Sequence, residues 1–131
     1  MRRTAVLVAI ATMTAGCRGS TTAPARRRPP DHLASTVWDA YCHDDAGLDR
    51  AIPEVLRGTR TPDVLARGLT SVSSELRDDA TRADRSDPAV AARVRRLAGA
   101  VDVLAAAVEA GRDTIRPLTG VLAANRALPN C

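Results

Sequence analysis

The chain has 131 residues, enough for one small domain, and 26% of them are charged while 2% are aromatic. The formal net charge is +4, but the first 30 residues hold six arginines and no acid, whereas the remainder has thirteen arginines against fifteen acidic residues. Because the positive excess is confined to one end, the composition does not indicate a nucleic-acid-binding domain.

The first sixteen residues have the layout of a secretory signal peptide. Arg2 and Arg3 provide a basic start, and residues 4–13 (TAVLVAIATM) follow as a short apolar run. A helix that crosses a membrane needs roughly 20 apolar residues, so this run is too short to span one. We therefore expect residues 1–16 to direct export and then to be removed.

Residues 14–17 (TAGC) resemble the lipobox of bacterial lipoproteins, in which the cysteine receives a diacylglyceryl group and becomes the new N-terminus. The resemblance covers residues 1–17 and departs from the family pattern at Thr14, where an aliphatic residue is typical. It implies that Cys17 is lipidated, with acyl chains such as palmitate. The protein would then be held on the extracytoplasmic face of the cell membrane. Cleavage after residues 23–25 (APA) is the alternative, and it would release a secreted protein.

Residues 17–30 are predicted to form a disordered, basic tether. Beyond the cysteine, the segment RGSTTAPARRRPP contains no aliphatic residue larger than alanine or proline, so it cannot bury enough apolar surface to fold. Arg26, Arg27 and Arg28 are candidates for contact with anionic lipid headgroups. A solvated spacer with no membrane contact is an equally good interpretation of the same residues.

Residues 31–131 are predicted to form a single helical domain. Its first helix is expected over about residues 34–45, since Leu33, Val37, Trp38 and Tyr41 have helical spacing. Gly47 and Pro53 interrupt the pattern that follows. A second piece or a kinked continuation is therefore expected through Leu56.

The next two helices have clear start signals. Thr61 before Pro62 and Asp87 before Pro88 are typical pairs of an N-cap residue and a first-turn proline. Apolar residues then recur at helical spacing, namely Leu65, Leu69, Val72 and Leu76 in one helix and Val90, Val94, Leu97, Val101, Leu104 and Val108 in the other. Ion pairs four residues apart are expected for Asp63 with Arg67 and for Asp78 with Arg82.

A shorter fourth helix is expected to begin near Thr114, because Pro117 is tolerated only in a first turn, and to end before Pro129. Its apolar side would contain Ile115, Leu118, Val121, Leu122 and Leu128. No segment shows the alternation of a half-buried strand. The predicted fold class is therefore all-α, an antiparallel up-down bundle of about four helices.

Once Cys17 is set aside, Cys42 and Cys131 remain, and they are predicted to form a disulfide. Exported proteins form such bonds, and in an up-down bundle the end of the last helix returns beside the start of the first. A redox-active pair is the alternative, but it would favour a C-x-x-C spacing, which this sequence lacks.

Residues 39–49 (DAYCHDDAGLD) form the one polar cluster with metal-binding chemistry. Asp39, His43, Asp44 and Asp45 are candidate ligands of a divalent cation, because carboxylates and imidazole suit such ions. The spacing is not that of a calcium loop, and the alternative is a solvated helix end. The sequence contains no phosphate-binding loop, haem-attachment motif or serine-nucleophile motif, so we expect no catalytic residue and no cofactor.

These observations predict a non-catalytic lipoprotein of the cell envelope. Its expected partners are the membrane, through the lipid anchor, and another envelope macromolecule that binds a helix face. Nucleic acid is not an expected partner. A lipoprotein that binds a small ligand or a divalent metal through residues 39–49 is the alternative.

Overall fold

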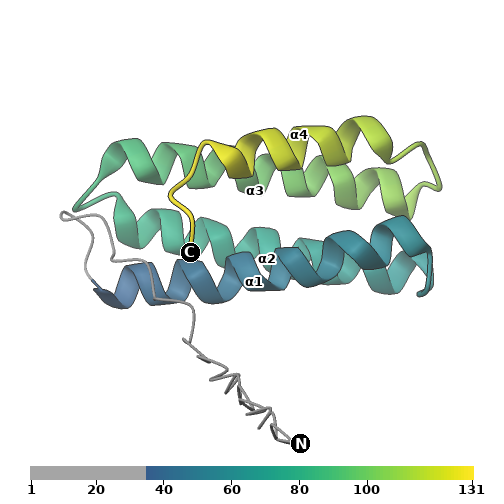
Figure 1. The fold of residues 1–131 in the computed structure, drawn as a ribbon, viewed down its shortest axis with the longest axis horizontal. Coiled ribbons are helices and arrows are strands. Elements are labelled where there is room, and N and C mark those ends of the chain that lie inside the picture. The colour runs from purple at the N-terminus through teal and green to yellow at the C-terminus, as the bar shows by residue number, and fades with distance from the viewer. Residues whose placement is uncertain (1–34) are drawn as a thin grey trace, which may run out of the picture.

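The computed structural model describes residues 35–131. Within that range the chain forms α1 (Ser35–Arg57), α2 (Pro62–Ala83), α3 (Pro88–Glu109) and α4 (Ile115–Arg126), with no strand. The helices run alternately up and down, and each packs against the next in the chain (Figure 1). This arrangement confirms the predicted all-α antiparallel bundle.

Several predictions concern residues that the structure does not describe. The signal peptide of residues 1–16 and the tether of residues 17–30 lie outside the described range. Cys17 and the cluster Arg26, Arg27 and Arg28 are among those residues. They stay predictions from the sequence.

α1 is one helix through Gly47 and Pro53, so of the two expectations for this stretch a separate second piece is wrong and a continuation of the first helix is confirmed. Gly47 faces α2, where an added Cβ would stand at an ordinary contact distance of 3.5 Å from the Val72 side chain, so the packing of the two helices does not require glycine here. Pro53 has no backbone N–H, so the carbonyl of Asp49, four residues earlier, loses its helical hydrogen bond. Asp49 is exposed, so the helix tolerates this loss. The helix ends at Gly58, whose φ of 59° suits glycine.

The predicted start of α3 is confirmed in detail. The Asp87 carboxylate accepts hydrogen bonds from the backbone N–H groups of Ala89 and Val90, at 3.1 and 3.0 Å. The helix stops before Gly111, which has a φ of 62°. Both ends are therefore set by local chemistry that the sequence displays.

The start and the ion pairs of α2 follow the predictions only in part. Thr61 precedes the helix, but its side chain makes no capping bond. The pair between Asp63 and Arg67 is present at 3.0 Å. Arg82, however, pairs with Asp79 at 3.3 Å, so the expected pair with Asp78 is wrong.

α4 buries a narrower stripe than expected. Leu118 and Val121 are buried and Leu128 follows them, but Ile115 is 70% exposed and Leu122 is 39% exposed. Seven residues make about two turns, so Ile115 and Leu122 lie one above the other on the predicted apolar side, next to the buried Leu118 and Val121. That side is wider than the stripe that is buried, because α4 packs mainly against one neighbour.

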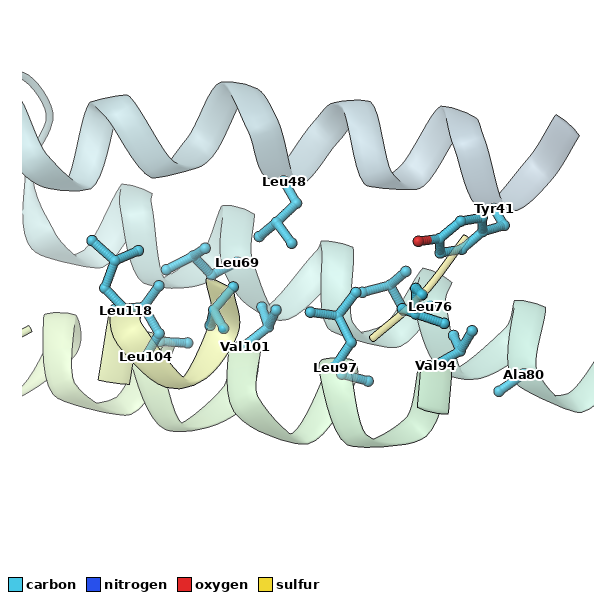
Figure 2. Packing of buried hydrophobic residues seen from close by; sticks show 14 of the residues in the cluster. Tyr41, Leu48, Leu69, Leu76, Ala80, Val94, Leu97, Val101, Leu104 and Leu118 are labelled. Atoms are coloured by element: carbon cyan, nitrogen blue, oxygen red, sulfur yellow. The ribbon is translucent and has the colours of Figure 1, made fainter. Parts of the chain in front are cut away.

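The core consists mainly of leucine, valine and alanine from all four helices. Figure 2 shows Leu48 of α1, Leu69 and Leu76 of α2, Val101 and Leu104 of α3 and Leu118 of α4 around one shared interior. Alanine and valine are small, so they let the helices approach closely, and the leucine side chains fill the space between them.

The predicted disulfide between Cys42 and Cys131 is present, with 5.5 Å between the two Cα atoms. It attaches the C-terminal segment, yellow in Figure 1, to α1 across the open side of the bundle. The bond closes a loop of 89 residues, and in the chain-entropy model a loop of this length contributes up to about 4–5 kcal/mol.

Candidate functional site

The four candidate metal ligands do not converge. Asp39 and His43 are exposed on α1, and the His43 Nδ1 lies 3.0 Å from the Asp44 carboxylate, whereas Asp44 and Asp45 are half-buried. Successive residues turn by about 100° around a helix, so these side chains spread over different faces. In residues 35–131 no group of three or more His, Cys, Asp or Glu side chains is placed to hold a metal ion. The predicted cation site is therefore not assembled.

A buried aspartate faces this region from α2. Asp79 is only 2% exposed; one carboxylate oxygen lies 3.3 Å from Arg82, and the other is buried without a hydrogen-bond partner. Burial, and after it the neighbouring Asp44 carboxylate, which can bond with Asp79 only if one of the two groups is protonated, raises the pKa of Asp79 to about 7. Sequence analysis missed this residue, although Asp79 lies at helical spacing from the core residues Leu76 and Ala83.

Two further polar groups of α1 are buried beside Asp79. The Tyr41 hydroxyl and one oxygen of Asp45 have no hydrogen-bond partner. Burial and then the charges of Asp45, Asp49 and Asp79 raise the pKa of Tyr41. Burial and the charge of Asp49 also raise the pKa of Asp45, and a hydrogen bond with Asn125 opposes that rise. We refer to Tyr41, Asp44, Asp45 and Asp79 as the acidic joint.

The cavity beside the acidic joint is too small for a ligand. It has a volume of about 10 Å³, close to the least that holds one water molecule. Its lining is apolar apart from the Tyr41 and Asp79 side chains, and consists of Val37, Trp38, Tyr41, Asp79, Ala83, Val90, Val94 and Pro129. The joint therefore contains ionisable groups but offers no space for a substrate.

A second polar cluster joins α2 to α3. The buried Ser73 hydroxyl hydrogen-bonds with the Asp102 carboxylate and accepts from Arg77 at 3.2 Å, while Arg77 also donates to Asp102. Arg77, and after it Ser73, lowers the pKa of Asp102. Because Ser73 is enclosed, this cluster holds the two helices together and does not present a nucleophile to solvent.

The outer surface between α3 and α4 is hollowed. One hollow, of about 290 Å³, is lined by Ala100, Val103, Arg116, Pro117 and Gly120. A second, of about 380 Å³, is lined by Val103, Ala107, Arg112, Asp113, Arg116 and Pro117. The two hollows share Val103, Arg116 and Pro117, so they form one continuous depression, which we call the α3–α4 groove.

One exposed aliphatic side chain lies in the α3–α4 groove. Val103 in its lining is 59% exposed, whereas Ile115 and Leu122 lie on the other side of α4 from the lining residues Arg116, Pro117 and Gly120. Gly120 in the lining borders open space, because a Cβ added there would meet no other part of the described chain within 4 Å. The groove therefore combines an apolar floor with open space.

The charges of the α3–α4 groove are mainly positive. Arg112 and Arg116 line it, and neither forms an ion pair with an acidic side chain of residues 35–131. Asp113 is the acidic residue of the lining, and its carboxylate accepts a hydrogen bond from the Ile115 backbone N–H at 3.0 Å. The groove thus favours a ligand that is apolar and carries negative charge.

None of the four described helices is both long and apolar enough to cross a membrane. Comparison with protein-family models, with curated proteins and with solved structures finds no match to this chain.

Proposed function

We propose that the protein is a lipid-anchored protein of the bacterial cell envelope that binds another envelope protein through the α3–α4 groove and catalyses no reaction. The observation that carries this proposal is the contrast in available space. The groove is open and apolar, whereas the cavity among the buried ionisable groups has a volume of about 10 Å³.

The shape and chemistry of the groove suit a helix of a partner protein. An amphipathic helix binds such a groove by placing aliphatic side chains in it at spacings of three and four residues. Val103, which is 59% exposed, is the aliphatic side chain of the groove that such a helix would contact. Arg112 and Arg116 favour a helix with glutamate or aspartate beside its apolar face, because unlike charges then meet at the edge of the contact.

Location at the membrane rests on the sequence. Lipidated Cys17 would hold the domain through the tether of residues 17–30, and Arg26, Arg27 and Arg28 would lie near the headgroups. The intact mass of the mature protein from the membrane fraction tests this part. A chain that begins at Cys17 with an added diacylglycerol is expected, and a lipid-free chain that begins near Arg26 would contradict it.

Site-specific photocrosslinking in intact cells tests the binding face. A photoreactive amino acid replaces Val103 in the groove, and the matched control carries it at Val64 of α2, which is also an exposed valine, at 38%. We expect the Val103 position to crosslink one envelope protein reproducibly and the Val64 position not to do so. The same crosslinked species from both positions, or none from Val103, would contradict the proposal.

A further inference from the structure

The acidic joint places carboxyl groups from two helices against each other with little to compensate their charge. Asp44 of α1 faces Asp79 of α2, and both are acceptors while ionised, so neither can donate to the other. One Asp79 oxygen is buried without a hydrogen-bond partner. It gains a partner in Asp44 only when one of the two carboxyl groups is protonated. The closed joint is therefore a structure that a proton stabilises.

The other groups around Asp79 do not remove its need for a proton. On its own helix, Arg82 approaches one carboxylate oxygen at 3.3 Å from an exposed position, and Asp78 adds a further negative charge. On α1, Tyr41 is a buried hydroxyl and Asp44 a carboxylate. α3 and the C-terminal segment line the adjoining cavity with apolar residues only, Val90, Val94 and Pro129.

We propose that the acidic joint is a proton-dependent latch, in which protonated Asp79 donates to Asp44 and holds the first half of α1 against α2. Loss of that proton leaves a buried charge beside Asp44, and separation of the helices relieves it by admitting water. The disulfide at Cys42 keeps this half of α1 attached to the C-terminal segment, so the opening is local.

Trp38 reports directly on this movement. It is the only tryptophan of the chain, it is buried, and it lines the same cavity as Asp79. Its ring centroid lies 5.9 Å from that of Tyr41, one turn further along α1. Opening of the joint therefore exposes Trp38 to solvent and to a quencher.

The test is acrylamide quenching of Trp38 in the full-length chain between pH 5 and pH 9, with far-UV circular dichroism recorded on the same samples. We expect the quenching constant to rise at least twofold in one transition while the helical signal stays constant. Asp79→Asn should abolish the transition and keep quenching low, because an amide donates to Asp44 at every pH. Asp44→Asn should also weaken or abolish the transition, because the amide removes the facing charge and donates to ionised Asp79, so the closed joint survives deprotonation. A transition of unchanged size and midpoint in this variant would overturn the proposal.

Asp78→Asn is the matched control, since it removes one carboxylate from the same helix at an exposed position next to Asp79. This variant should keep the transition with a nearly unchanged midpoint. The proposal is overturned if the natural chain shows constant quenching or if Asp79→Asn keeps the transition. It is also overturned if the helical signal is lost with the same midpoint, because the transition is then global unfolding.

Discussion

The acidic joint and the α3–α4 groove separate two properties that a functional site usually combines, namely ionisable side chains and open space. Ionisable side chains gather at the joint, where the adjacent cavity has a volume of about 10 Å³, whereas the aliphatic Val103 is exposed at the groove, where a hollow of about 290 Å³ is open. Residue chemistry alone would place the site at the joint. Available space is the reason why we propose the groove as the binding site, and we propose that the joint instead controls the position of α1.

The largest expected effect on stability comes from the disulfide between Cys42 and Cys131. Replacement of Cys42 and Cys131 together by serine should lower the free energy of unfolding by up to about 4–5 kcal/mol, since the loop of 89 residues is no longer closed in the unfolded chain. Urea unfolding of the full-length chain measures this loss. Cys17→Ser is the control and should leave the free energy of unfolding unchanged. Equal stability of the double variant and the natural chain would show that the bond contributes nothing.

The next effect is the pH dependence that Asp79 imposes on stability. Its pKa is about 7 in the folded chain against 3.8 for an ordinary aspartate, so the folded state holds more protons between these pH values and stability falls as pH rises through that range. The whole window corresponds to at most about 4 kcal/mol. The pKa values of Asp63, Asp84 and Asp102 are lowered, so their contributions are already complete above about pH 4.

Asp79→Asn should therefore raise the free energy of unfolding at pH 8 by about 2–3 kcal/mol and have much less effect at pH 5, because it removes the buried charge. Urea unfolding of both proteins at the two pH values measures the difference. Parallel loss of stability in the two proteins between pH 5 and pH 8 would show that Asp79 is not the titrating group.

A smaller effect is expected at the cluster that joins α2 to α3. Ser73→Ala removes a buried hydroxyl that bonds with Asp102 and Arg77, and it should cost about 1–2 kcal/mol. Ser74→Ala, at the exposed neighbouring position, should change the melting temperature little. If both variants melt together with the natural chain, the cluster is not a structural link.

The smallest effect on stability should come from the groove itself. Val103→Asp places a charge at an exposed position, so the free energy of unfolding should change by no more than about 0.5 kcal/mol, as should that of Val64→Asp. Thermal unfolding of the two variants measures this. A large loss for Val103→Asp alone would mean that Val103 supports the core and is not a free contact residue.

The features that sequence analysis predicted are those that nearby residues determine. Asp87 and Pro88 specify the start of α3 within four residues, and the cysteine pair follows from the antiparallel order of the helices. Burial of Asp79 was not predicted because it depends on where α1 crosses α2, which no local pattern contains. Exposure of Ile115 was missed for a similar reason, since an apolar residue at the edge of a helix is buried only if a second helix covers it.

The most direct test of the central claim fills the groove without disturbing the fold. Gly120→Leu occupies the hollow between α3 and α4, and Gly68→Leu is the matched control, because a side chain at either glycine would meet no other part of the described chain within 4 Å. The photoreactive residue is placed at Val103 in both variants, and crosslinking is measured in intact cells. We predict that Gly120→Leu loses the partner and that Gly68→Leu keeps it. Retention of the partner by Gly120→Leu would contradict the assignment of the α3–α4 groove as the binding site.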